Sequence, residues 1–205
     1  MMKTKFPALL FLFVIITSFK QNVIVENDKI VTLSEFKAMI DSAGLSFTMP
    51  EGYNETVVRK NGDLNYDFAI KNTKEDFEVR YSVWSLKPEM EEYRKCKLDS
   101  AHCLMINPNV IYSGRAQANL LNMTAGESMK IASFPPTAVK KEFNADNGGS
   151  AFFEFKCEFG KGYKYGQMIV LHKDNVADVI ITYLSNDREK HPDLMMVAFH
   201  SLIYK

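Results

Sequence analysis

The stretch GQMIVLHKDNVADVIITYLS, residues 166–185, decides the fold expected for this chain. Two apolar runs, Met168–Leu171 and Val179–Leu184, flank a polar turn at residues 173–175. Neither run alternates strictly between apolar and polar residues, so both faces of each strand are expected to be covered. A sheet that is covered on both faces needs other layers above and below it. The stretch therefore predicts a central hairpin inside a layered protein.

The composition is that of a globular protein without an electrostatic bias. Hydrophobic residues make up 46% of the 205 residues and charged residues 24%, and this length suits one domain with a sizeable core. Twenty-five basic residues against twenty-five acidic ones give a formal net charge of zero. That balance argues against broad electrostatic binding to nucleic acid or to an anionic membrane.

The first twenty residues are typical of a secretory signal peptide. Lys3 and Lys5 form a basic start, an apolar run at 6–16 is interrupted by Pro7, and Ser18 supplies a small residue near its end. The run is short for a bilayer span, which takes about 20 residues, although an uncleaved N-terminal anchor is the alternative. No later segment is long and apolar enough to cross a membrane. We therefore expect an exported protein, periplasmic, cell-surface or extracellular, without stable membrane insertion.

Residues 21–43 are predicted to form a linker and a helix, followed by a single domain at 44–205. Residues 32–35 have the pattern of a capping box. Apolar residues follow at helical spacing, and Gly44 stands where a C′ glycine would end the helix. The pattern predicts a helix from about residue 33 to 43.

Alternation between apolar and polar residues predicts further strands, joined mostly by hairpins. Residues 64–71 and 77–86 alternate clearly and are expected to pair with each other. Shorter strands are predicted at 139–143 and 151–159, with a turn at 146–149 between them. The number of hairpin signals indicates an antiparallel sheet.

Two more helices are predicted in the second half of the chain. Asn107 and Pro108 suit an N-cap followed by a proline at the first helical position, and the helix is expected to run to residue 123. Its packed face is predicted to carry Val110, Ile111, Gly114, Ala118 and Leu121. Pro192 can open a C-terminal helix that reaches Leu202. The sum is an α+β fold, an antiparallel β-sheet of about seven strands with helices packed on its faces.

The segment LSFTMPEGY, Leu45–Tyr53, resembles the opening strand of the PsbP-like family, in which a Phe precedes a Pro-x-Gly-aromatic turn. The tail, a long hairpin that runs into a helix carrying Leu202 and Ile203, is also similar to that family. The resemblance covers residues 44–205, except that 87–107 do not match the pattern. It implies an α/β/α sandwich, a fold shared with a Ran-binding nuclear import factor and with exported bacterial proteins. It also implies a non-enzymatic accessory or binding role, and it transfers no active site.

The three cysteines leave the disulfide state open. In an exported protein, Cys96 and Cys103 could form a disulfide that closes a small loop. The alternative is that all three thiols are free and two of them are buried as small hydrophobic groups. Cys157 lies in a predicted strand and is expected to be a core thiol.

Residues 87–107 are the least regular stretch and are predicted to form a long loop, a type of segment that is often functional. Asp99, His102 and Cys103 lie within five residues of one another in this loop, and such groups could bind a divalent metal. The competing interpretation is an ordinary polar loop. His172, His191 and His200 stand elsewhere, without a supporting cluster.

Two aromatic residues near this loop are candidates for contact with a ligand or partner. Trp84 falls on the more polar face of its strand, and Tyr93 lies within the loop itself. An exposed aromatic residue beside a loop often contacts a ligand or a protein partner. Trp84, Tyr93 and His102 are therefore the predicted binding residues. The structural alternative is that a helix covers Trp84. The charged residues Asp63, Asp67, Asp76, Glu78 and Arg80 are expected to form a solvent-facing outer face.

No catalytic or cofactor motif rises above background in this sequence. We expect an exported, non-enzymatic domain that binds an envelope protein or a small ligand, with no cofactor and no nucleic-acid partner. The alternative is a metal-dependent or thiol-based hydrolase that uses Asp99, His102 and Cys103.

Overall fold

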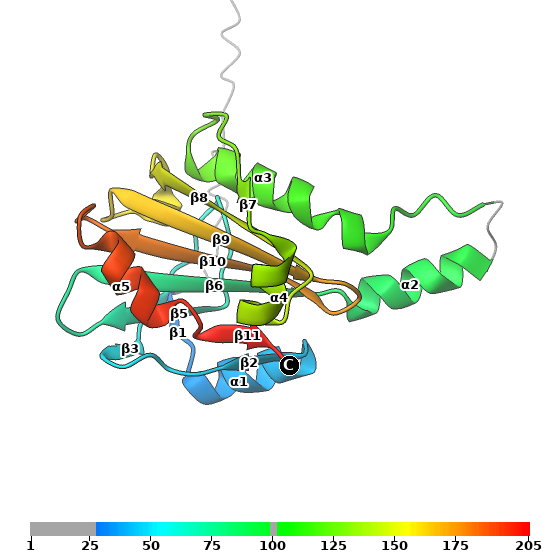
Figure 1. The fold of residues 1–205 in the computed structure, drawn as a ribbon, viewed down its shortest axis with the longest axis horizontal. Coiled ribbons are helices and arrows are strands. Elements are labelled where there is room, and N and C mark those ends of the chain that lie inside the picture. Colours follow the sequence, from blue (N-terminus) through cyan, green and yellow to red (C-terminus); the bar gives the residue numbers. More distant parts are fainter. Residues whose placement is uncertain (1–27, 99–101) are drawn as a thin grey trace, which may run out of the picture.

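The computed structural model describes residues 28–98 and 102–205. The signal peptide predicted at 1–20 lies outside the described residues, as does the start of the predicted linker. The described part has an α+β fold, a seven-stranded antiparallel sheet with helices packed on both faces (Figure 1). This confirms the fold class that the sequence predicts.

The strands of the sheet lie in the order β3-β5-β6-β10-β9-β8-β7. In that order their bounds are Tyr53–Glu55, Phe68–Asn72, Phe77–Ser85, Ala177–Ser185, Tyr165–Lys173, Asn147–Glu154 and Ala132–Ser133. Two small sheets pair β1 (Lys29–Ile30) with β4 (Val57–Val58), and β2 (Leu45–Phe47) with β11 (Leu202–Tyr204).

The five α-helices of the described residues are α1 (Leu33–Ser42), α2 (Lys87–Leu98), α3 (Tyr112–Met123), α4 (Pro136–Phe143) and α5 (His191–Ala198). Two short 3₁₀ turns, η1 (Pro108–Val110) and η2 (Glu158–Gly160), precede α3 and β9.

The β9–β10 hairpin is the centre of the sheet. β10 pairs with β9 over nine residues, from Ala177 opposite Lys173 to Ser185 opposite Tyr165, and over nine residues with β6 on its other side. All nine residues of β10 are buried. Covered faces explain why both apolar runs are continuous rather than alternating.

Two separate cores lie on the two faces of the sheet. The first core is covered by α1, α4, α5 and the β2–β11 pair, and in it the Phe36 ring stacks on Phe68 with centroids 4.4 Å apart. The second core lies under α3, whose Leu120 and Met123 are fully buried with Met168 of β9. Each face of the central sheet therefore contributes side chains to a separate hydrophobic core.

Helix α1 begins and ends as its sequence predicts. The Thr32 side chain accepts from the Glu35 N–H at 3.3 Å, and the Glu35 carboxylate accepts from the Thr32 N–H at 2.8 Å. This reciprocal pair is the capping box. Gly44 follows the helix with a φ of +77°, a conformation that glycine adopts without a Cβ clash.

The strand predicted at 139–143 is wrong, because these residues belong to α4. Val139 and Phe143 lie four residues apart, so one helical face buries both against the first core. Asn144 ends the helix in the left-handed conformation, with a φ of 52°. The turn predicted at 146–149 is also wrong, since β8 begins at residue 147.

The packed face predicted for the helix at 108–123 is wrong. The chain makes the short turn η1 first, capped by the Asn107 side chain, and α3 then buries Ala116, Leu120 and Met123. The C-terminal helix ends at Ala198, and Leu202 instead belongs to β11. The second difference reflects the pairing of Leu202 with Phe47 of β2, which local spacing does not encode.

The solvent-facing charged face predicted at Asp63, Asp67, Asp76, Glu78 and Arg80 is wrong for the last two of these residues. Glu78 and Arg80 are only 5% and 3% exposed. Leu64 and Tyr66 do not extend β5 but pack in the second core, on the same side of the sheet. Irregular chain at 59–67 and 155–163 therefore covers this part of the face, where the sequence pattern leaves it open.

Candidate functional site

Helix α2 projects from the body of the protein. It continues outward from the end of β6, and residues 102–111 return toward α3 (Figure 1). We call α2 together with residues 102–111 the arm. The long irregular loop predicted at 87–107 is thus wrong over 87–98, which are helical. Met90 is the buried residue of α2, so the helix lacks the apolar stripe by which sequence analysis detects helices.

Local interactions explain why this stretch is helical despite its poor packing. Pro88 lies in the first turn, where a missing N–H costs nothing. Glu91 and Lys95 form an exposed i,i+4 ion pair at 2.7 Å, and Lys95 and Lys97 occupy the last turn, where cations favour the helix dipole.

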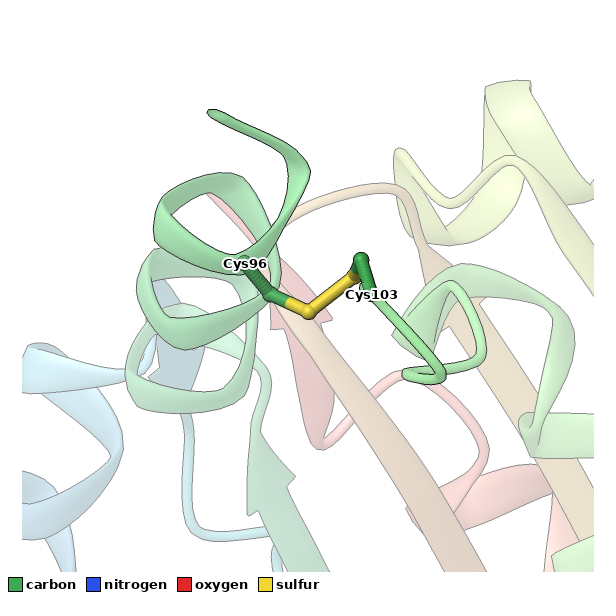
Figure 2. Close-up of a disulfide and its surroundings, with 2 residues drawn as sticks. All are labelled: Cys96 and Cys103. Carbon is green, nitrogen blue, oxygen red and sulfur yellow. A yellow bond between two sulfur atoms is a disulfide. The ribbon is translucent and has the colours of Figure 1, made fainter. Parts of the chain in front are cut away.

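A disulfide closes the outer end of the arm. Cys96 in the last turn of α2 is bonded to Cys103 in the returning segment, and their Cα atoms are 5.3 Å apart (Figure 2). This is the pair that the sequence left open. The bond holds the two sides of the arm together where neither side is packed on the sheet.

The outer part of the arm exposes large apolar side chains. Leu98 lies two residues after Cys96 and is 90% exposed. Leu104 directly follows Cys103 and is 95% exposed. The exposed apolar residues of the arm are Leu98, Leu104, Met105, Ile106, Val110 and Ile111. We call these six residues the arm apolar surface. Scattered exposed leucines are ordinary, but six apolar residues within fourteen positions of one braced element form a patch typical of an interaction site.

An open hollow lies between the two sides of the arm. Its volume is about 410 Å³, and its lining includes Glu89 of α2, Arg115 of α3, and Leu104, Ile106 and Ile111 of the returning segment. The arm therefore combines protruding apolar side chains with a recess that has an apolar lining.

Two of the three residues of the metal site suggested by the sequence lie in the described part of the chain. Asp99 lies outside the described residues, His102 is exposed at the end of the arm, and the sulfur of Cys103 is bonded to Cys96. While this disulfide is intact, Cys103 offers no thiolate and so acts neither as a metal ligand nor as a nucleophile. In residues 28–98 and 102–205, no group of three His, Cys, Asp or Glu side chains could hold a metal ion.

The predicted binding residues are spread along the arm rather than gathered in one place. Trp84 lies near its base, Tyr93 in the middle of α2 and His102 near its tip. Trp84 is half-buried, with the Arg115 guanidinium of α3 centred 5.3 Å from its ring, so a helix covers it. Tyr93 is half-buried, with the Lys97 ammonium 5.5 Å from its ring.

A buried polar cluster at the tip of the β9–β10 hairpin was missed by sequence analysis. His172 Nδ1 lies 2.6 Å from Asp178 Oδ1, and His172 Nε2 lies 2.9 Å from Asp174 Oδ1. The second oxygen of Asp178 accepts from Arg115 of α3. His172 and Asp178 are cross-strand partners, so the hairpin register contained the signal that these two side chains meet.

The environment of His172 favours its charged form. Burial by itself lowers the pKa of the imidazole, but the hydrogen bonds and charges of Asp178 and Asp174 outweigh it and raise the pKa above the ordinary value. The ring is also stacked on Tyr112, with centroids 4.4 Å apart. Because both nitrogens already face carboxylates, His172 has no position left from which to act as a base toward a substrate.

The same hairpin tip carries the base of the arm. The Asn175 N–H donates to the Asn109 side chain at 2.9 Å, and the Arg94 guanidinium of α2 donates to the Asn175 side chain at 3.4 Å. Arg115 links α3 to the same turn through Asp178. The orientation of the arm is therefore set by polar contacts with the rigid centre of the sheet.

The other candidates stand apart from this cluster. His191 is buried between the rings of Phe77 and Phe152, and neither of its nitrogens has a hydrogen-bond partner within the described part of the chain. Burial lowers its pKa to about 4. Cys157 is half-buried and lies just before η2 rather than in a strand, and burial raises the pKa of its thiol. A raised pKa disfavours the thiolate, so Cys157 is not poised as a nucleophile.

Comparison of the chain with protein-family models and with curated proteins finds no match. None of the helices in residues 28–98 and 102–205 has the length and apolar character that crossing a bilayer requires.

Proposed function

We propose that this protein is an exported, non-enzymatic binding domain that engages a protein partner in the cell envelope through the arm apolar surface. The single observation that carries the proposal is the exposure of Leu98 and Leu104 on both sides of a disulfide at the end of a projecting arm. Water contact with large apolar side chains is unfavourable, and a partner that covers them removes that cost.

The shape of the surface favours a protein over a small ligand. Small ligands bind in concave sites that enclose most of their surface, whereas the arm presents its apolar side chains outward. Its hollow is wide and open, and suits an apolar side chain from a partner surface. The disulfide and the Asn109–Asn175 contact hold the arm in one arrangement before binding, so less conformational entropy is lost when the partner docks.

The predicted signal peptide supports a location outside the cytoplasm. The Cys96–Cys103 disulfide supports the same location, because disulfides form and persist in exported proteins. The resemblance of residues 44–205 to the PsbP-like family supports a non-enzymatic role. On this proposal the partner is an envelope protein with an apolar surface complementary to the arm.

Site-specific photo-crosslinking in the cells that make the protein tests this proposal. A photoreactive phenylalanine analogue replaces Leu104 in one variant and Met196 in a matched control, since Met196 is also exposed, at 56%, but lies on α5. We expect a discrete protein adduct from position 104 and none from position 196. The identified partner is then purified, and Leu104→Asp is expected to weaken its binding by about tenfold or more, as loss of a buried anchor does.

Three results would overturn the proposal. They are a lipid adduct from position 104, which would indicate a membrane surface, an adduct with a second copy of the chain, and adducts of equal yield from positions 104 and 196.

A further inference from the structure

A second cavity, formed by elements other than the arm, has a charged lining. Its volume is about 180 Å³, and it lies where the chain after β4, the middle of β6 and η2 meet. The charged residues that line it are Arg59, Lys60, Arg80, Lys161, Asp28 and Glu158. Among the described residues, the cations Arg59, Arg80 and Lys161 all border this one space.

Arg80 is the buried member of this lining, and one end of its guanidinium is unused. Its Nε donates to Glu78 at 2.6 Å and its Nη1 donates to the Phe159 carbonyl. Its Nη2 donates to no acceptor in residues 28–98 and 102–205. An arginine has five N–H donors, and those of Nη2 are available to an acceptor that enters the cavity. Since Arg80 is 3% exposed and lines the cavity, the cavity is where an acceptor for Nη2 would lie.

The orientation of this guanidinium is fixed by its surroundings. It lies between the rings of Tyr66 and Phe159, 4.8 Å and 4.7 Å from their centroids. The second carboxylate oxygen of Glu78 accepts from the Tyr163 hydroxyl at 3.1 Å, so both oxygens of Glu78 are engaged by protein donors. A guanidinium held in this way is pre-organised, and binding an acceptor costs little further ordering.

The chain at Arg59 is fixed to the same cluster. The Arg59 N–H donates to the Tyr66 hydroxyl at 2.7 Å, and the Tyr66 ring covers Arg80. Lys161, which also lines the cavity, has its ammonium 3.5 Å from the Glu158 carboxylate. Cationic side chains from three separate segments therefore converge on one small space.

We propose that this cavity binds a phosphate group, with Arg80 and Arg59 as its main ligands. A planar guanidinium fork matches the oxygens of a tetrahedral oxyanion and binds them through charge-assisted hydrogen bonds. The cavity is smaller than the pockets of about 300 Å³ or more that enclose drug-sized ligands. It therefore suits a single phosphate group rather than a whole nucleotide, whether that group is free or carried on a larger molecule that extends into solvent.

Calorimetric titration of the purified chain with inorganic phosphate at constant ionic strength tests this proposal. Arg59→Gln removes one ligand, and Arg188→Gln is the matched control, because Arg188 is an exposed arginine over the Phe152 ring and outside the cavity. We expect saturable binding that Arg59→Gln weakens by about tenfold or more, as the loss of a charge-assisted hydrogen bond does. We expect Arg188→Gln to leave the affinity unchanged.

Titrations with sulfate and acetate define the class of anion. Weaker binding of both would assign the site to phosphate. Equal binding of sulfate would reduce the assignment to any tetrahedral oxyanion and overturn the phosphate proposal, and preference for acetate would replace it with a carboxylate site. The proposal also fails if phosphate does not bind, or if Arg59→Gln and Arg188→Gln weaken it equally, since that result indicates non-specific attraction. Arg80→Lys keeps the charge but loses the fork, and where this variant unfolds, Lys161→Gln provides the second measurement.

Discussion

His172 Nδ1 lies 2.6 Å from Asp178 Oδ1 across the β9–β10 hairpin, at the position where the sheet meets the base of the arm. Asp174 approaches the other imidazole nitrogen at 2.9 Å, and Arg115 of α3 binds the other oxygen of Asp178. His172 and Asp178 together thus link β9, β10 and α3, and the charged form of the histidine is favoured.

This arrangement makes stability depend on pH at the alkaline side of neutrality. The folded state raises the pKa of His172 above the ordinary value of 6.5, so above about pH 6.5 the folded chain holds a proton that the unfolded chain releases. The stabilisation is fully present below about pH 6.5 and is lost as the pH rises through the folded pKa. His172→Gln is expected to destabilise the protein by about 2 kcal/mol at pH 6, and by less at pH 9.

Urea unfolding of wild type and His172→Gln from about pH 6 to about pH 9 measures this difference. His200→Gln is the control, because His200 forms an exposed pair with Glu142 at 2.8 Å. A His172→Gln penalty that stays constant over this range would contradict the assignment of a charged His172.

His191 has the opposite effect on the acid side. Its pKa is lowered to about 4 by burial, so between about pH 6.5 and about pH 4 the unfolded chain binds a proton that the folded chain excludes. Stability therefore falls as the pH falls through this window. His191→Phe keeps an aromatic ring beside Phe77 and Phe152 and is expected to be more stable than wild type by about 2 kcal/mol at pH 5. Thermal unfolding at pH 5 and pH 7 tests this, and an equal effect at both pH values would show that titration of His191 is not the cause.

The buried Glu78–Arg80 pair is expected to be sensitive to the loss of either partner. Glu78→Gln leaves the Arg80 charge buried and is expected to destabilise by about 3 kcal/mol. The double variant Glu78→Gln/Arg80→Met removes both charges and is expected to be more stable than the sum of the two single effects predicts. Urea unfolding of all four proteins gives the coupling energy, and Glu91→Gln, which breaks an exposed pair, is expected to have no measurable effect. Additive effects of the two single changes would show that the pair does not act as a unit.

The disulfide is expected to order the arm without determining the stability of the body. Its cysteines are seven residues apart, and closing so short a loop stabilises by about 2 to 3 kcal/mol in the chain-entropy view. Because α2 buries little beyond Met90, this stabilisation is expected to act locally. In the Cys96→Ser/Cys103→Ser variant, hydrogen exchange is expected to speed up in α2 and to stay unchanged in β9 and β10. Retained protection of α2, or faster exchange in the central strands, would be the contrary result.

Local signals in the sequence correctly predicted several elements of the structure. The capping box at Thr32 and Glu35, the Asn107 cap and the β9–β10 hairpin depend on residues within a few positions of one another, and each is present in the structure. The same local logic failed at α4, where Val139 and Phe143 suit a strand or a helix, and at α2, where a helix exists with little burial. In both cases periodicity alone does not separate the alternatives.

The sequence by itself determined the class of the fold, because continuous apolar runs at 168–171 and 179–184 require a sheet covered on both faces. It also brought Cys96 and Cys103 close enough along the chain to be considered as a pair. Only the tertiary structure decided that Glu78 and Arg80 are buried, since the segments that cover them lie up to about 80 positions away along the chain. It also decided that the apolar side chains of the arm are exposed. Burial depends on which distant segments of the chain pack together. Such contacts produce no periodic pattern of apolar residues in the sequence.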